Sequence, residues 1–279
     1  MLPKQLIIIG GGVSIREGLE KGLKDLIPKT FSCGLNYAYK YFDTTLTCGI
    51  DEKFFNENYK DIAKMPLFLG KSNVSVNIAG GKNCYLFKHS MKYDRELFGG
   101  IYSSTLAGLF ALSTFIKLMD VGTIFLLGAD YGVIKDSEGK PLVDKLGRPL
   151  THFYQEETGH PDHRGIGRIN WYTSSLVDPK DKNKRISNAE KEYRVYANET
   201  KVKIYNVSPQ SAIPTFEKIT YDEFFKKIEP ITQTQEELRK EVEAKFQGLI
   251  YMYEYIRKGK ITFDARGQLL NEQGSPFIL

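Results

Sequence analysis

The hydrophobic positions of this chain fall into short apolar runs that alternate with amphipathic stretches. The first run, at residues 6–9, ends in three glycines, and apolar residues then recur at helical spacing over residues 15–26. A short β-branched run closed by glycine is typical of a buried strand, and recurrence every three or four residues is typical of a helix. Pro28 is expected to end that helix. The first segment therefore predicts a strand, a glycine turn and a helix.

Four further apolar runs predict strands, and they precede the most apolar segment of the chain. The runs are residues 30–38, 44–51, 65–71 and 84–90. Residues 99–132 then combine a small-residue turn, a helix that is apolar on nearly all sides and a continuously apolar strand. Such a helix packs against a sheet, and such a strand is covered on both faces. The alternation predicts an α/β fold with a Rossmann-like, doubly wound, mostly parallel sheet.

A long polar stretch, at about residues 133–185, interrupts this alternation. It holds four prolines, three of the four histidines and the single tryptophan. Loops of this length inside a compact domain are usually functional, so we expect a lid. Residues 187–200 and 201–209 then predict a closing helix and strand. We find no internal repeat.

The composition changes after residue 230. Residues 234–260 predict one long helix with an apolar stripe, and the tail beyond them predicts a hairpin. We therefore expect a Rossmann-like domain over residues 1–230 and a C-terminal helix-plus-hairpin extension over residues 231–279. The extension either packs on the core or acts as an arm through which a homo-oligomer forms.

Charge and cysteine content narrow the class of protein. The net charge of +5 over 279 residues is mild and scattered, so it does not require nucleic acid and fits an anionic small molecule equally well. Three cysteines without a CxxC spacing argue against a disulfide framework or a zinc ribbon. The sequence shows neither a signal peptide nor an apolar run long enough to span a membrane. We expect a soluble, cytoplasmic protein.

The glycine turn after the first strand is a candidate anion site. Gly10, Gly11 and Gly12 precede Ser14, which stands at an expected helix amino terminus. Glycine lets a backbone approach a phosphate closely, and first-turn N–H groups and the helix dipole favour an anion. The spacing is neither GxGxxG nor that of a P-loop, so a plain tight turn is the alternative.

Polar residues after other predicted elements are further candidates. Asn36 and Asp51 follow the second and third strands, where side chains line the ligand crevice of an open α/β sheet. Asn36 suits a base or ribose and Asp51 suits ribose hydroxyls, while turn residues that satisfy their own backbone are the alternative. Ser103, Ser104 and Thr105 precede the apolar helix and either form a second anion site or merely cap that helix.

Candidate catalytic groups lie after the most apolar strand. Asp130 ends that strand and either works in the site or caps the next turn. A histidine suits a general base and an arginine suits a leaving phosphate. The lid concentrates such side chains: His152, Glu156, Glu157, His160, Asp162, His163, Arg164 and Arg168. No helical spacing supports a metal at His160, Asp162 and His163, so we predict no metal site, and a solvated loop is the alternative.

Five segments follow one another in a characteristic order: IIIGGGVSIRE, CGLN, GGIYSSTLAGLFAL, VGTIFLLGADYG and VKIYNVSPQSAIPTF. This order resembles that of the family 42 bacterial sialyltransferases, and also that of proteins like archaeal 6-hydroxymethylpterin diphosphokinase. The resemblance covers roughly residues 5–225. The sialyltransferase resemblance implies that Gly10–Gly12, Asn36 and Ser103–Thr105 hold a cytidine nucleotide. It also implies that His160, in a lid "GH" pair, is the general base.

Two departures limit that resemblance. The tyrosine that supports the leaving phosphate in the family falls on Gly132 here, and Tyr131 stands one position early. If the segment HRGIGRIN is the lid match, Arg168 stands where the histidine belongs. Nucleotide binding therefore transfers to this chain better than sialyl transfer does.

A nucleotide-sugar glycosyltransferase is the first functional hypothesis. It would move a sugar from a CMP-sugar or another nucleotide-sugar donor to a hydroxyl of a small-molecule or glycan acceptor. His160 or His163 would deprotonate the acceptor, and Arg164 or Tyr131 would stabilise the departing phosphate.

Two other functions stay open. An ATP- and Mg²⁺-dependent diphosphokinase or phosphotransferase would place Asp130 or Asp51 near the metal. A non-catalytic nucleotide-binding or assembly module would use the C-terminal helix for association.

Overall fold

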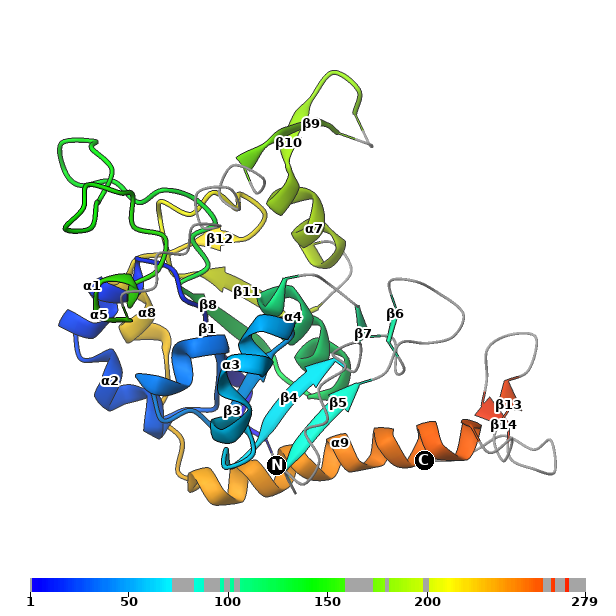
Figure 1. Cartoon of the computed structure of the whole chain (residues 1–279). Coiled ribbons are helices and arrows are strands. Elements are labelled where there is room, and N and C mark those ends of the chain that lie inside the picture. The colour runs from blue at the N-terminus through cyan, green and yellow to red at the C-terminus, as the bar shows by residue number, and fades with distance from the viewer. Residues whose placement is uncertain are drawn as a thin grey trace.

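One eight-stranded sheet organises the computed structural model of the chain (Figure 1). The structure describes residues 2–71, 83–87, 96–97, 101–102, 106–158, 173–178, 181–197, 201–257, 262–263 and 269–270. All seven neighbouring strand pairs of this sheet are parallel. In sheet order the strands are β12 (Glu217–Lys218), β11 (Lys203–Asn206), β8 (Thr123–Leu127), β1 (Gln5–Ile9), β2 (Ser32–Leu35), β3 (Leu46–Gly49), β4 (Phe68–Lys71) and β5 (Cys84–Phe87).

Helical elements connect these strands and cover the sheet. The predicted α/β, Rossmann-like, doubly wound fold is confirmed. The helices are α1 (Ile15–Glu20), α2 (Leu23–Leu26), α3 (Glu52–Ile62), α4 (Ala107–Leu118), α5 (Gln155–Thr158), α7 (Asn188–Ala197), α8 (Tyr221–Lys227) and α9 (Gln235–Arg257), with 3-10 turns η1 (Ile27–Lys29) and η2 (Asn36–Lys40). Three small antiparallel pairs join β6 (Glu96–Leu97) to β7 (Ile101–Tyr102), β9 (Ser175–Val177) to β10 (Arg185–Ser187), and β13 (Thr262–Phe263) to β14 (Leu269–Leu270).

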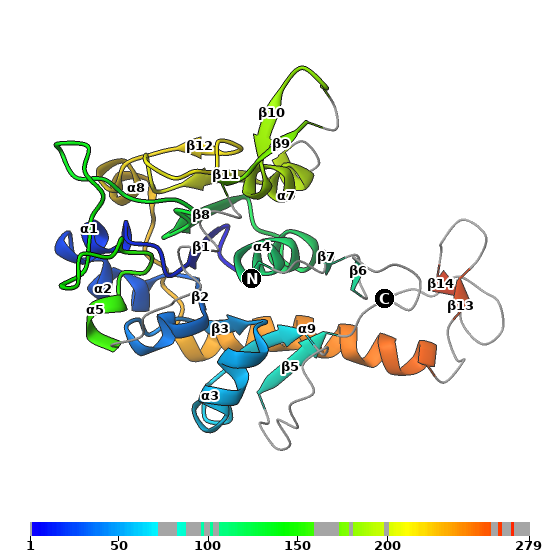
Figure 2. The same cartoon turned by 45° about the horizontal axis from the view of Figure 1, so that its top comes forward.

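The central strand β1 explains how the two hydrophobic layers form. Successive side chains of a strand point to opposite faces, so Leu6 and Ile8 join one core cluster while Ile7 and Ile9 join the other. The first cluster packs under α4, α7 and the first half of α9, and the second packs under α1, α2 and α8. Figure 2 shows the layers with the sheet between them. Burial on both faces accounts for the continuous apolar runs in the sequence.

The helix predicted for residues 15–26 is interrupted. Gly22 has φ +90°, in the left-handed region that glycine adopts without strain, and it separates α1 from α2. Pro28 lies within the turn η1 that follows. The hydrophobic spacing correctly predicted helical structure on both sides of Gly22, but it did not reveal the break between the two helices.

The lid begins with a repeated unit, which corrects our expectation of no internal repeat. Residues 134–141 (IKDSEGKP) and 142–149 (LVDKLGRP) share an eight-residue pattern, and we call each unit an octad. In each octad the Asp carboxylate accepts two backbone N–H bonds from its own turn, at 2.9 Å in the first and 2.9 and 3.0 Å in the second. The octads stack through backbone bonds from Leu142 to Ile134 and from Leu150 to Leu142.

The helix α9 packs on the core with its first half. Leu238, Val242 and Phe246 are fully buried in the first cluster. The Tyr85 hydroxyl donates to Glu243 at 2.6 Å, and the Arg239 guanidinium donates to the loop before β3. In the described part of the chain, no helix is long and apolar enough to cross a membrane.

Candidate functional site

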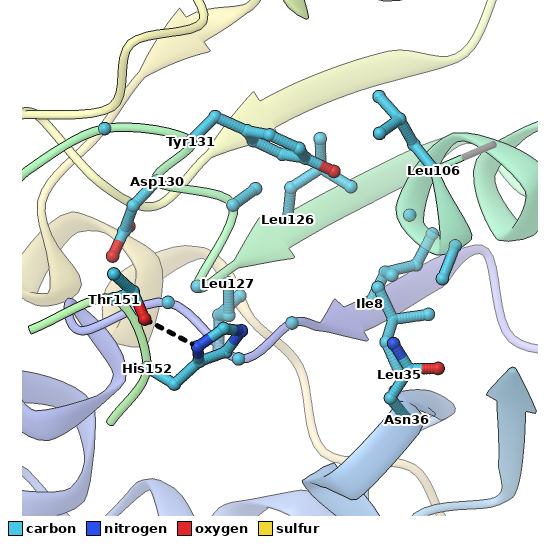
Figure 3. Close-up of a pocket in the computed structure, with 18 of the residues that line it drawn as sticks. Ile8, Leu35, Asn36, Leu106, Leu126, Leu127, Asp130, Tyr131, Thr151 and His152 are labelled. Atoms are coloured by element: carbon cyan, nitrogen blue, oxygen red, sulfur yellow. Dashed lines mark hydrogen bonds between the residues drawn. The ribbon is translucent and has the colours of Figure 1, made fainter. Parts of the chain in front are cut away.

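A pocket opens at the carboxyl ends of the central strands, where the order of the sheet reverses. The chain runs from β1 outward through β2 to β5, then returns to the other side of β1 with β8. Open α/β sheets bind ligands at such a switch point. Figure 3 shows side chains from both halves converging there. The lining residues are Ile8, Gly10–Gly12, Leu35, Asn36, Asp51, Leu106–Gly108, Leu126–Gly132, Thr151, His152, Tyr154 and Tyr193.

Two of the three glycines after β1, Gly10 and Gly12, lie directly against the backbone at the end of β8. The Gly10 N–H donates to Leu127 at 2.7 Å, and the Gly12 N–H donates to Gly128 at 2.9 Å. A Cβ on Gly10 or on Gly12 would lie 2.6 Å from the Gly128 carbonyl oxygen. The predicted phosphate site is therefore smaller than expected, because the amides of Gly10 and Gly12 already donate to backbone carbonyls of the protein.

Gly11 differs from its neighbours. Its carbonyl accepts a bond of 3.0 Å from the Phe153 N–H, and no backbone bond among the described residues uses its own N–H. A Cβ on Gly11 would lie 2.7 Å from Cδ2 of His152. His152 and Phe153 thus contact this glycine directly, and its amide is the one of the three that has no backbone acceptor among the described residues.

Asp130 and Ser14 hold the ends of β8 and β1 together. One carboxylate oxygen of Asp130 accepts the Ser14 hydroxyl at 2.6 Å, and the other accepts the Ser14 N–H at 2.9 Å. Burial raises the pKa of the Asp130 carboxyl, and the bonds from Ser14 oppose that rise. Ser14 stands at the N-cap of α1, but its side chain makes no cap bond and does not line the pocket. Asp130 also lines the pocket, and its carboxylate clamps Ser14 in the turn after β1 rather than capping the turn that follows Asp130.

Asn36 lines the pocket with its backbone in the left-handed conformation, which is strained for a residue other than glycine. It directly follows β2, as predicted, and has φ +48°. Its Oδ1 is buried, and no donor among the described residues reaches it. A buried oxygen without a partner is unfavourable unless a ligand supplies one, and backbone strain of this kind gathers at functional sites.

Tyr131 is the second residue in that conformation, with φ +51°. Within the described residues these are the two non-glycine positions with positive φ, and both line the pocket. The Tyr131 hydroxyl lies 2.7 Å from that of Tyr193, and a Cβ on Gly108 would meet both hydroxyls. The tyrosine pair therefore abuts the first turn of α4.

The amino terminus of α4 faces the same space. Ala107 and Gly108 line the pocket, and the N-cap Leu106 has no side-chain oxygen with which to bond them. First-turn amides have no acceptor within their own helix, so they are available to an anion. Ser103, Ser104 and Thr105, predicted for this turn, lie outside the described residues.

Asp51 also reaches the pocket. It follows β3, as predicted, and occupies the N-cap position of α3 without capping that helix through its side chain. Asp51 is partly exposed. The pKa of the Tyr37 hydroxyl is raised to about 12, mainly by burial, and the charge of Asp51 contributes to this rise.

His152 is the pocket histidine, and the sequence did not single it out from the other lid residues. Its Nδ1 lies 2.9 Å from the Thr151 hydroxyl (Figure 3). Its ring stacks on Tyr154 with centroids 5.1 Å apart. The signal was present in the octads, because His152 stands where the two preceding units carry Asp136 and Asp144.

The remaining lid candidates are not placed. His160, His163, Arg164 and Arg168 lie outside the described residues. In the part of the chain that the structure describes, no group of three or more His, Cys, Asp or Glu side chains could hold a metal ion.

Fold and pocket together define an α/β protein of Rossmann-like type with a ligand pocket at its switch point. No protein-family model matches the sequence, and no curated protein matches it. Among solved structures, the chain is similar to the sialyltransferase CstII from Campylobacter jejuni, solved in complex with a substrate analogue, cytidine-5'-monophosphate. The two are 16% identical over 79% of this chain and 86% of that chain, with a TM-score of 0.40. The expected likeness to pterin diphosphokinases has no support in these comparisons.

Proposed function

We propose that this protein is a transferase that binds a nucleotide-activated sugar in the pocket and moves the sugar to an acceptor hydroxyl. The buried Oδ1 of Asn36 carries the proposal, because it is an acceptor that no donor among the described residues satisfies and that a ligand donor would satisfy. An exocyclic amine of a nucleobase or a ribose hydroxyl is such a donor. The position of Asn36 at the switch point of the sheet supports the same assignment.

Phosphate binding falls to the groups around the glycine turn and α4. Gly11 and the first two residues of α4, Ala107 and Gly108, all line the pocket, and we assign phosphate binding to their amides. The hydroxyl pair of Tyr131 and Tyr193 lies beside that helix turn. In the proposed reaction these donors stabilise the negative charge that the nucleotide carries as it leaves.

The lid supplies the titratable groups of the reaction. His152 lies in the pocket, and His160 and His163 follow it in the sequence. Arg164 is retained as a candidate partner of the leaving phosphate. A neutral histidine can take the proton of the acceptor hydroxyl at physiological pH.

The contacts of Asp130 favour a sugar transferase over an ATP- and magnesium-dependent reaction. Mg²⁺ is usually held by carboxylates together with substrate phosphates. Both carboxylate oxygens of Asp130 are instead bonded to Ser14. The carboxylate is therefore already held by the turn after β1, and we assign it to that turn rather than to a metal.

Titration calorimetry with CMP, CDP, UDP and ATP, with and without Mg²⁺, tests the proposal on the full chain. Binding of a pyrimidine nucleotide without metal is expected. Binding that requires both ATP and Mg²⁺ would contradict it, as would the absence of binding by every nucleotide.

The variant Asn36→Gly locates that binding. Glycine adopts φ +48° without strain, so the variant removes the side chain while the fold keeps its stability. Loss of one hydrogen bond predicts an affinity about tenfold lower. Asn183→Gly, in the exposed turn before β10, is the control and should bind as the wild type does.

A further inference from the structure

The chemistry available to His152 depends on which ring nitrogen carries its proton. In neutral imidazole one nitrogen donates and the other accepts, and the neighbour of the first nitrogen decides which is which. Here the neighbour of Nδ1 is the Thr151 hydroxyl, at 2.9 Å. The other nitrogen, Nε2, is directed toward the middle of the pocket (Figure 3).

The hydrogen-bond chain that determines this proton starts in the second octad. The buried carboxylate of Asp144 accepts Nε of Arg148 at 2.8 Å and two backbone N–H groups of its own turn. The bond from Arg148 is the main cause that lowers the pKa of Asp144 to about 2. The carboxylate is therefore ionised at neutral pH and can only accept hydrogen bonds.

Gln155 connects this carboxylate to Thr151. Because Asp144 only accepts, the Gln155 amide nitrogen faces it, at 3.3 Å, and the amide oxygen faces the other way. That oxygen accepts the Thr151 N–H at 2.9 Å and the Thr151 hydroxyl at 3.0 Å. A threonine hydroxyl has one proton to donate, and here the proton goes to Gln155.

The Thr151 oxygen then has only lone pairs left for His152, so Nδ1 must be the donor. With the opposite tautomer, the Thr151 hydroxyl would turn to Nδ1 and leave its own oxygen facing that of Gln155 at 3.0 Å without a proton between them. The first arrangement places one proton in each of the contacts of the Thr151 hydroxyl, with Gln155 and with Nδ1, and the second leaves two acceptors in contact.

We infer that Asp144, Gln155 and Thr151 hold neutral His152 in the Nδ1–H tautomer, which makes Nε2 the general base of the proposed transfer. In the step, Nε2 takes the proton of the acceptor hydroxyl as that oxygen bonds to the anomeric carbon of the donor. The bond from that carbon to the phosphate oxygen breaks, and its electron pair leaves with the nucleotide. Asp144, Gln155 and Thr151 are positioning residues. The base role rests on the proposed function, whereas the tautomer does not.

The tautomer is measured by two-bond ¹H–¹⁵N correlation of the histidine rings in the full, ¹⁵N-labelled chain. The His152 signals are assigned by their loss in His152→Gln. At neutral pH we expect Nδ1 to show the shift of a protonated nitrogen and Nε2 that of an unprotonated one. The reverse pattern in the wild-type protein would overturn the inference.

Variants of the chain of bonds test its cause. Thr151→Val and Asp144→Asn should move the His152 signals toward the Nε2–H tautomer, and Thr151→Ser should restore the wild-type pattern. The matched control is Asp136→Asn, which removes the same turn carboxylate from the first octad, where no bond to Gln155 exists. Equal shifts in Asp136→Asn and Asp144→Asn would show a general effect of the lid and contradict the relay.

Turnover separates the base role from the proposed function. With a nucleotide-sugar donor that is turned over, His152→Gln should lower kcat by ~10²–10⁴-fold while nucleotide affinity changes little. An unchanged kcat overturns the base role and leaves the transferase standing. If no nucleotide binds to the wild type, the proposed function and the base role both fail, and the NMR result still decides the tautomer.

Discussion

At the residue scale, the glycines after β1 are required by contacts within the protein. Gly12 faces both the Gly128 carbonyl and the Asp130 carboxylate, at Cβ distances of 2.6 and 2.5 Å. The sequence predicted a close approach at this turn and assigned it to a phosphate. The run of glycines is visible in the sequence, whereas the strand that approaches it lies far along the chain and is defined only by the fold.

Gly12→Ala should therefore destabilise the protein even without any ligand. The added Cβ must displace backbone atoms of β8 or the Asp130 clamp, which predicts a loss of about 1–3 kcal/mol in the free energy of unfolding. Urea denaturation measures it.

Gly122→Ala is the matched control for that change. Its Cβ would meet nothing nearer than the Lys4 carbonyl at 3.7 Å, so we expect a change within about 0.5 kcal/mol. Equal losses in the two variants would refute the packing argument for Gly12.

At the element scale, the sequence predicted the strands of the sheet well, with one exception. β12 has two residues, both exposed, so it has no hydrophobic pattern from which it could be predicted. The lid was predicted from its length and polarity, but its octads were missed because their order comes from Asp side chains bonding to local N–H groups. Asn36 and Asp51 were predicted because they follow strands, whereas His152 was missed because its signal lies in the spacing of the octads and not in a hydrophobic pattern.

The second octad should depend on pH through Asp144. Its folded-state pKa, about 2, lies below the unfolded value of about 3.9. A lowered carboxyl pKa stabilises the folded state above the unfolded pKa, and that stabilisation is lost as the pH falls through the folded pKa. Between pH 5 and pH 2, the free energies of unfolding of the wild type and Asp144→Asn should converge. A difference that stays constant over this range would contradict the assignment.

At the scale of the whole molecule, the C-terminal helix belongs in part to the core. The sequence left two roles open for residues 234–260, and the burial of Leu238, Val242 and Phe246 shows that packing on the core is one that α9 performs. The apolar stripe was readable from the sequence. The surface that it covers could not be predicted, because it is assembled from distant parts of the chain, among them Tyr85 of β5 and the loop before β3.

Phe246→Ala should lower the free energy of unfolding by about 3–5 kcal/mol, since it empties a fully buried site beside Tyr85. Lys245→Ala, one position away and exposed, should change it by less than about 0.5 kcal/mol. Chemical denaturation monitored by circular dichroism measures both. A small effect of Phe246→Ala would mean that the core is complete without α9.

The reversal of strand order also determines when the pocket can form during synthesis. β1 is made first and pairs with β2 early, but its other neighbour is β8, and the Ser14–Asp130 clamp joins residues 116 positions apart. Pairings this distant in sequence form slowly and late. A nascent chain therefore carries β1 with one bare edge until more than a hundred further residues have emerged from the ribosome. Until then β1 is a strand that needs shielding from other unpaired edges.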